Sequence, residues 1–132
     1  MSHAPALSAS FVIYAKDVAR VAAFYELTLA LPLLETGPGF ILLGSGAIEL
    51  AVVQIPDAIA TEIDISTPPY LREETPLKFS FLVRDLEQVQ RLAMAAGGGT
   101  QPLGAAWHWR GQLHLDGHDP EGNIVQFRQI AG

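Results

Sequence analysis

The sequence of 132 residues has no cysteine, which excludes disulfide bonds, thiolate zinc sites and a cysteine nucleophile. Positive charge is scarce, because 8 Lys and Arg residues stand against 14 Asp and Glu residues and the formal net charge is −6. A nucleic-acid or anionic-membrane partner would need a basic face, so we expect neither. The most apolar stretch, residues 40–55, is interrupted by glycines and Glu49 and is too short to span a bilayer. Residues 1–5 lack the basic and apolar regions of a signal peptide, so we expect a cytoplasmic protein.

Motifs of several enzyme classes are missing as well. The sequence has no Gly-x-Ser-x-Gly nucleophile elbow, no Walker phosphate loop and no dinucleotide-binding fingerprint. The glycine run at residues 97–99 follows a helical segment instead of opening one, so it predicts a helix C-terminus and not a phosphate loop. No linear motif therefore identifies the chemistry.

The chain does contain an internal repeat, which sets the architecture of the fold. Residues 11–24, FVIYAKDVARVAAF, recur at residues 79–92 as FSFLVRDLEQVQRL. In each copy a strand-like alternation stops at an aspartate, Asp17 or Asp85, and a helical stripe begins. Because Asp accepts hydrogen bonds from the first free amides of a helix, both residues are predicted to be N-caps. Two copies of one half-sheet can face each other across a cleft.

Each copy is predicted to continue into short strands. These strands, punctuated by Pro and Gly, are expected near residues 40–43, 47–54, 105–109, 112–115 and 123–129. The Asp-Pro-Glu-Gly segment at residues 119–122 predicts the hairpin turn before the last strand. Residues 55–76, rich in Pro and acidic residues, read as a linker with a helical turn near residues 58–63.

The sequence therefore predicts an α+β fold with two βαβββ modules in a single domain over residues 1–132. Module one covers about residues 8–54, the linker residues 55–76, and module two about residues 77–130. The hydrophobic content of 49% is ample for a core.

Two tandem modules with Asp-capped helices, a Phe24-Tyr25 pair before Leu-x-Leu-Pro, and a closing Asp-Pro-Glu-Gly-Asn hairpin span about residues 10–129. This combination resembles the vicinal oxygen chelate superfamily, which includes glyoxalase I, extradiol dioxygenases, fosfomycin-resistance enzymes and bleomycin-binding proteins. The resemblance implies an open half-barrel sheet around a central cleft, with the helices outside. It also implies a homodimer in which modules of two chains complete or extend the cleft. Ala30 departs from the family, which usually has Gly after the first helix.

The resemblance also implies positions for a divalent metal, held by His, Glu or Gln from the first and last strand of each module. The matching positions are Ser10, Glu49, Lys78 and Gln126. Glu49 and Gln126 each offer an oxygen to a hard cation, whereas Ser10 is a poor neutral ligand. The ammonium group of Lys78 would repel a metal ion. We therefore expect no cofactor, and a divalent metal bound by Glu49, His114 and Gln126 is the alternative.

The alternation of the strands predicts which side chains line the cleft. Because Ile48 and Leu50 must face the helix, Glu49 faces the cleft, and the same argument places Lys78 there. Lys78 and Glu49 could then form a structural ion pair or act as catalytic residues that move protons or bind anions. Aromatic rings with a few polar anchors are typical of ligand pockets. The predicted ligand-binding residues are Tyr14, Glu49, Lys78, Trp107, Trp109, His114 and Gln126.

Three functions remain open for this cleft. The leading hypothesis is a binding protein of the bleomycin-resistance type, which sequesters a small hydrophobic or aromatic molecule that could be anionic. The alternative is a divalent-metal-dependent lyase, isomerase or dioxygenase of the glyoxalase type. The third is a metal-free enzyme in which Lys78 or Glu49 moves a proton. Arg110 and Arg128 could supply anion contacts, or they could simply be solvated near strand ends.

Overall fold

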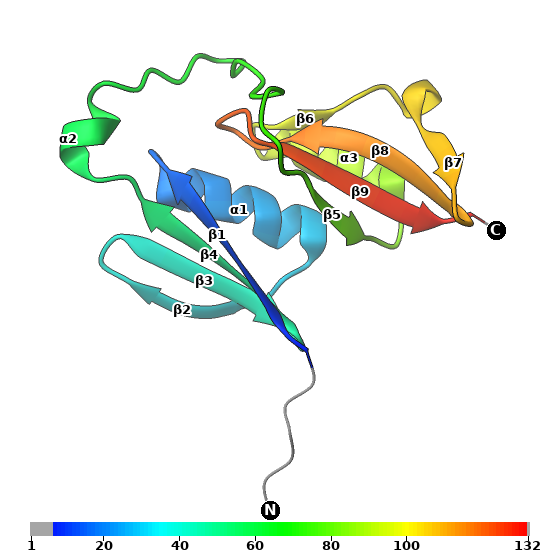
Figure 1. Ribbon diagram of the computed structural model, residues 1–132, viewed down its shortest axis with the longest axis horizontal. Coiled ribbons are helices and arrows are strands. Elements are labelled where there is room, and N and C mark those ends of the chain that lie inside the picture. Colours follow the sequence, from blue (N-terminus) through cyan, green and yellow to red (C-terminus); the bar gives the residue numbers. More distant parts are fainter. Residues whose placement is uncertain (1–6, 132) are drawn as a thin grey trace, which may run out of the picture.

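The computed structural model describes residues 7–131, which form two modules with one sheet and one long helix each (Figure 1). Module one contains β1 (Ala9–Ala15), α1 (Val18–Leu29), β2 (Leu33–Gly37), β3 (Phe40–Ser45) and β4 (Ile48–Gln54). Its strands follow the order β1-β4-β3-β2, with β1 parallel to β4 and the other neighbours antiparallel. The short helix α2 (Asp57–Ala60) follows it and overlaps the helical turn predicted near residues 58–63.

Module two repeats this topology. It contains β5 (Phe79–Leu82), α3 (Leu86–Ala95), β6 (Gly99–Thr100), β7 (Trp107–Trp109), β8 (Gln112–His118) and β9 (Ile124–Ile130). Its strands follow the order β5-β9-β8-β6, β5 is parallel to β9, and β7 also pairs with β8. In module two, β6 and β7 together take the position that β2 has in module one. A 3₁₀ turn at Leu103–Ala105 separates β6 from β7. The predicted α+β class with two βαβββ modules is confirmed.

Both long helices begin where the sequence predicts. The side chains of Asp17 and Asp85 accept hydrogen bonds from backbone amides in the first turns of α1 and α3, as N-caps do. Helix α1 ends at Ala30, whose φ of 53° lies in the left-handed region that favours glycine. Gly97, with a φ of 88°, follows α3, which confirms the predicted helix C-terminus. Within residues 7–131 no helix is long and apolar enough to cross a membrane.

One hydrophobic core joins the modules, because the two long helices contact each other behind the sheets in the view of Figure 1. Phe24 of α1 is fully buried, and its ring lies 6.5 Å from that of Phe127 in β9. Burial of such a side chain stabilises the fold by about 1.5–3 kcal/mol. The ring of Phe11 in β1 lies 4.7 Å from that of Phe79 in β5, its counterpart in the repeat. The face of each sheet that the helices do not cover is left open (Figure 1).

The hairpin between β8 and β9, residues 119–123, attaches module two to module one. The fully buried Asp119 accepts hydrogen bonds of 2.8 Å from the Tyr25 hydroxyl and from the side-chain amide of Asn123. Burial raises the pKa of the Asp119 carboxyl, and these hydrogen bonds oppose that rise. Burial also raises the pKa of Tyr25 well above its usual value, and the charge of Asp119 adds to this effect. The sequence predicts the turn, but not this buried network.

The linker runs above the two sheets and is attached at both ends (Figure 1). Near α2, the ammonium group of Lys16 contacts the carbonyl oxygen of Ile63. Further along, Arg72 forms an isolated parallel bridge with Asn123 of the hairpin.

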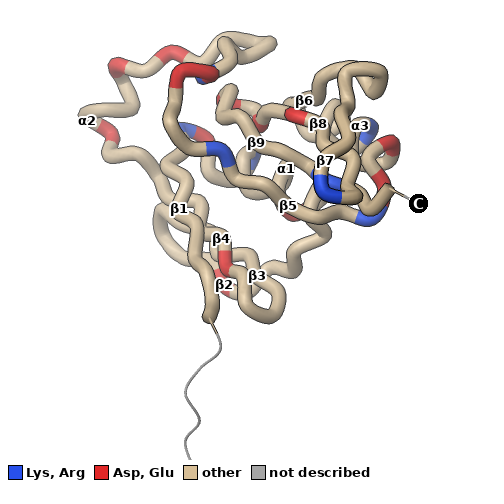
Figure 2. The backbone as a smooth tube through the Cα atoms, turned by 45° about the vertical axis from the view of Figure 1, so that its right-hand side comes forward, with Lys and Arg blue, Asp and Glu red and all other residues tan. Residues whose placement is uncertain are grey.

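Acidic positions follow the linker in Figure 2, whereas basic positions lie beside β5 and β7. Basic residues therefore lie at the module-two sheet, although the chain as a whole is acidic.

Candidate functional site

The open face of the module-two sheet carries most of the polar side chains that the sequence analysis selects. Residues alternate along β8, so Leu115 packs in the core while His114 and Asp116 point to the opposite face. We call this surface the module-two face. Its side chains come from β5 and the residue before it, from β8 and from β9: Lys78, Ser80, Gln112, His114, Asp116, His118, Gln126 and Arg128.

A polar strip crosses the module-two face from β8 through β9 to β5. The ammonium group of Lys78 lies 3.2 Å from both carboxylate oxygens of Asp116. The amide of Gln126 donates to the same carboxylate at 3.4 Å, and its Oε1 accepts a hydrogen bond of 2.6 Å from Ser80 Oγ. Ser80 Oγ in turn accepts from Arg128 Nε at 2.8 Å. Because each member holds the next, these side chains have defined positions.

An aromatic wall stands beside this strip. The ring of His114 stacks on Trp107 with centroids 5.5 Å apart, and it lies 5.7 Å from the ring of Trp109 in a tilted arrangement. His114 is buried, and its Nδ1 donates to the carbonyl oxygen of Gln112 at 3.1 Å, since a carbonyl can only accept. Trp107 and Trp109 remain 41% and 60% exposed, so part of their aromatic surface is available for contact.

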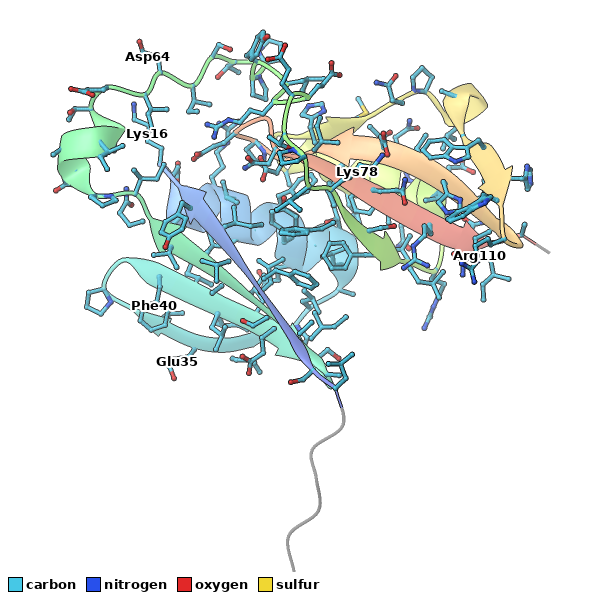
Figure 3. The ribbon with its side chains drawn as sticks, in the orientation of Figure 1. Lys16, Glu35, Phe40, Asp64, Lys78 and Arg110 are labelled. Carbon is cyan, nitrogen blue, oxygen red and sulfur yellow. The ribbon has the colours of Figure 1, made fainter. Side chains whose placement is uncertain are left out.

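One hollow on this face lies at the aromatic wall, and we call it the tryptophan hollow. Its volume is about 460 Å³. It is lined by Ser80, Trp109, Arg110, Gln112, His114, Gln126 and Arg128. The guanidinium group of Arg110 lies over the Trp109 ring, 5.4 Å from its centroid, which is a cation–π distance. Figure 3 shows Arg110 and Lys78 on the module-two sheet.

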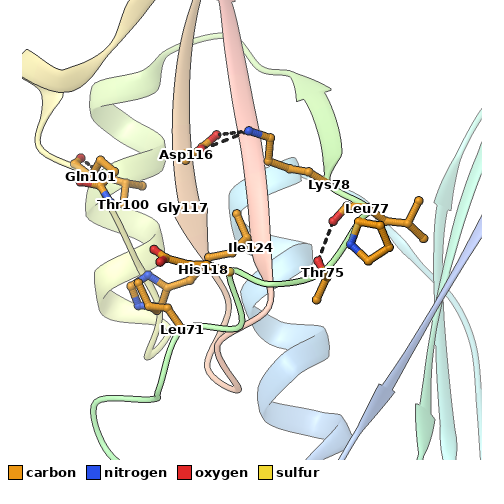
Figure 4. A pocket seen from close by; sticks show the side chains of 12 residues that line it. Leu71, Thr75, Leu77, Lys78, Thr100, Gln101, Asp116, Gly117, His118 and Ile124 are labelled. Atoms are coloured by element: carbon orange, nitrogen blue, oxygen red, sulfur yellow. Dashed lines mark hydrogen bonds and ion pairs between the residues drawn. The ribbon is translucent and has the colours of Figure 1, made fainter.

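The second hollow lies between module two and the linker, and we call it the linker hollow. It has a volume of about 400 Å³, and residues 71–78 form one side of it (Figure 4). Lys78 and Asp116 lie within hydrogen-bond distance of each other at its edge, and His118 lines it further along β8. Burial lowers the pKa of His118, and the charge of Asp119 opposes that effect.

The structure gathers the predicted residues of module two but not those of module one. Lys78, Trp107, Trp109, His114 and Gln126 share the module-two face. Tyr14 on β1 and Glu49 on β4 belong to the other sheet, where Glu49 is exposed and pairs in register with Ser10. The ion pair between Lys78 and Glu49 that the sequence allowed does not form among residues 7–131. Lys78 pairs with Asp116 on the module-two face instead.

Asp116 is the residue that the sequence reasoning missed. It stands two positions after His114 in β8, so the same alternation that places His114 on the face also places Asp116 there. Its register partner in β9 is Gln126, and the β5 partner of Gln126 is Ser80. Strand parity alone could therefore have identified it.

The residues at the family's metal positions do not fit a metal ion. The Lys78 ammonium occupies one position and is held by Asp116, and the Gln126 oxygen already accepts from Ser80. Across the part of the chain that the structure describes, no three His, Asp or Glu side chains are grouped so that they could hold a metal ion.

Comparison with known proteins identifies the fold. No protein-family model matches the sequence, and no curated protein matches it significantly. A glyoxalase/bleomycin resistance protein/dioxygenase family enzyme from Burkholderia phytofirmans PsJN is similar in structure, with a TM-score of 0.68, 18% identity, and coverage of 95% of this chain and 99% of that one. A glyoxalase/bleomycin resistance protein from Albidiferax ferrireducens T118 has a TM-score of 0.65 and 15% identity, covering 91% and 95%.

A third similar structure has a known ligand. It is a bleomycin-binding protein from Streptomyces verticillus complexed with copper(II)-bleomycin, with a TM-score of 0.58, 20% identity, and coverage of 98% of this chain and 99% of that one. At these identities the likeness concerns the fold.

Proposed function

Since the chain has the fold of glyoxalase, bleomycin resistance and dioxygenase proteins, we propose that it binds a small planar molecule on the module-two face, without a metal ion. The observation that carries this proposal is the aromatic wall beside the polar strip. Trp107 and Trp109 offer partly exposed aromatic surface, and the strip offers hydrogen-bonding groups in fixed positions. An apolar wall with a few convergent polar groups is the usual composition of a small-molecule site.

Binding is better supported than metal-dependent catalysis. A family-type metal centre would require Lys78 to leave Asp116 and to lose its charge, and Gln126 to release Ser80. The bleomycin-binding protein of similar fold, solved with copper(II)-bleomycin bound, is an example of this fold used for binding. A metal-free proton transfer by Lys78 has less support, because its ammonium group is paired with a carboxylate.

We further propose that two chains form a homodimer in which module one of one chain covers module two of the other. The module-one sheet exposes an apolar face, with Val12 50%, Tyr14 60% and Leu34 53% exposed. Exposed apolar surface of this kind gains free energy when it is covered. In such a dimer Tyr14 and Glu49, which are predicted from the sequence to line the cleft, could reach the ligand site of the partner chain.

The tryptophans make this proposal directly testable. The chain has two tryptophans, and both belong to the aromatic wall, so their fluorescence reports on the site alone. We expect saturable changes in emission on titration with planar compounds such as naphthoate and naphthamide. Trp109→Ala should weaken binding about tenfold, because aromatic stacking is lost. Tyr70→Ala, at a linker side chain that is 81% exposed, is the control. No response to any planar compound, or equal affinities for both variants, would refute the site.

A further inference from the structure

We infer that the ligand carries a negative charge, as in a planar aromatic carboxylate, and that Arg128 holds that carboxylate in the tryptophan hollow. This inference rests on the proposed binding function and adds the chemical class of the ligand.

Arg128 carries a charge that no described side chain neutralises. Its guanidinium group donates to Ser80 Oγ at 2.8 Å, to the side-chain oxygen of Gln112 at 2.8 Å and to the carbonyl oxygen of Ser80 at 3.3 Å. All three acceptors are neutral. Within residues 7–131 no carboxylate lies within 4.0 Å of Arg128, whereas Lys78 pairs with Asp116 and Arg91 with Glu87.

A shortage of acidic side chains does not explain this. The chain has 14 Asp and Glu residues against 8 Lys and Arg residues, and of the cations in the described part of the chain Lys78 and Arg91 pair with a carboxylate. Among residues 7–131 Arg128 is one of the unpaired cations, and it lies in the tryptophan hollow. The net charge of the polar strip supports the same conclusion. Lys78 and Asp116 neutralise each other, and Gln126 and Ser80 are neutral, which leaves the positive charge of Arg128 at one end.

The guanidinium group is also held in place for a ligand. Its acceptors come from the neighbouring strands β5 and β8, so the side chain is fixed from two sides before any ligand arrives. Of the donors on Nη1 and Nη2, one N–H each has no acceptor among residues 7–131. Fixed donors of an arginine lose little conformational freedom on binding, and they suit a carboxylate.

The body of the ligand follows from the other walls of the hollow. Trp109 and His114 line the same cavity as Arg128 and present an aromatic surface to it. A volume of about 460 Å³ falls within the range of small-molecule sites. Arg110, which lies over the Trp109 ring, adds positive potential at the rim. One fixed guanidinium beside an aromatic wall is matched by one carboxylate on a flat apolar body.

The test compares two compounds of the same shape and different charge. We would titrate the full chain with naphthoate and with the neutral naphthamide, following tryptophan emission and calorimetry. The wild-type protein should bind naphthoate about tenfold or more tightly than naphthamide. Arg128→Gln should weaken naphthoate binding about 10- to 100-fold and change naphthamide binding little, because a hydrogen bond to a charged group is lost only in the first case.

Two controls separate charge from folding. Arg91→Gln removes an exposed arginine on α3 and should alter neither affinity. In the wild-type protein, added sodium chloride should weaken naphthoate binding and leave naphthamide binding unchanged, which tests the charge even if the Arg128 variant does not fold.

The outcomes distinguish this inference from the proposed function. Equal wild-type affinities for the two compounds would overturn the inference that the ligand is an anion, but would not contradict the proposed binding site. A preference for naphthoate that survives Arg128→Gln and disappears in Arg110→Gln would overturn the assignment to Arg128. If neither compound binds, the proposed function itself fails.

Discussion

The hairpin carboxylate of Glu121 offers a sharp test of how the modules are joined. Glu121 is 4% exposed and lies in the turn between β8 and β9. Its oxygens accept hydrogen bonds from the backbone amide of Lys16 at 2.9 and 3.0 Å and from that of Asp17 at 2.7 Å. Both amides lie just before α1. A carboxylate of module two therefore accepts hydrogen bonds from two backbone N–H groups of module one at the start of its helix.

The cost of removing Glu121 follows from these contacts. A hydrogen bond to a charged group contributes about 1.5–3 kcal/mol, and two amide donors are involved. Lys16 is half-buried and Asp17 is exposed, so water can replace part of the loss. We therefore expect Glu121→Ala to lower the free energy of unfolding by about 2–4 kcal/mol, and Glu121→Gln, which keeps one acceptor, by about half as much.

Urea unfolding followed by circular dichroism measures this change. Glu87→Ala is the matched control, because the Glu87 side chain is 69% exposed and pairs only with Arg91 on α3 among the described residues. That variant should lose no more than about 0.5 kcal/mol. A Glu121→Ala protein within about 0.5 kcal/mol of wild type would refute the role of the hairpin in joining the modules.

Three further predictions concern single residues and use the same unfolding assay. Asp85→Ala removes the N-cap of α3 and should cost about 1 kcal/mol, whereas an unchanged stability would show that the cap contributes nothing. Gly122→Ala should cost about 2–3 kcal/mol, because Gly122 has a φ of 87° and an added Cβ would collide with the Tyr70 carbonyl. Gly46→Ala, with a φ of 62° and open space around it, should cost only about 1 kcal/mol, and equal losses would contradict the collision. Because burial lowers the pKa of His118, the unfolded state binds a proton that the folded state does not, so stability should fall as the pH drops below about 6.5. His118→Gln should remove this part of the pH dependence of stability, and an unchanged pH dependence would contradict the role of His118.

The sequence predicts what local patterns determine. The repeat identifies Asp17 and Asp85 as caps because capping depends only on the next few residues. Strand alternation likewise places Lys78, His114 and Gln126 on one face, because neighbouring strands keep their parity across a sheet. Resemblance to a known superfamily then supplies the arrangement of the modules.

The sequence does not predict contacts that depend on how the modules pack. Glu49 holds the last-strand position of module one and Lys78 the first-strand position of module two. Both are predicted to face the cleft, which suggested an ion pair, yet α1 and α3 meet behind the sheets and the two residues lie on separate sheets. The burial of Asp119 depends on Tyr25, which lies far away in the sequence. Whether such residues meet depends on how the two helices pack against each other, and no short stretch of sequence encodes that packing.

The most direct test of the central claim is naphthoate binding before and after removal of divalent metals. The protein as purified would be titrated by tryptophan fluorescence, then treated with EDTA, dialysed and titrated again. We predict the same dissociation constant in both titrations, because the aromatic wall and Arg128 would hold the ligand without a metal ion. Binding that disappears after chelation and returns with one added divalent metal, but not in Glu49→Ala, would contradict the account and identify a metal centre.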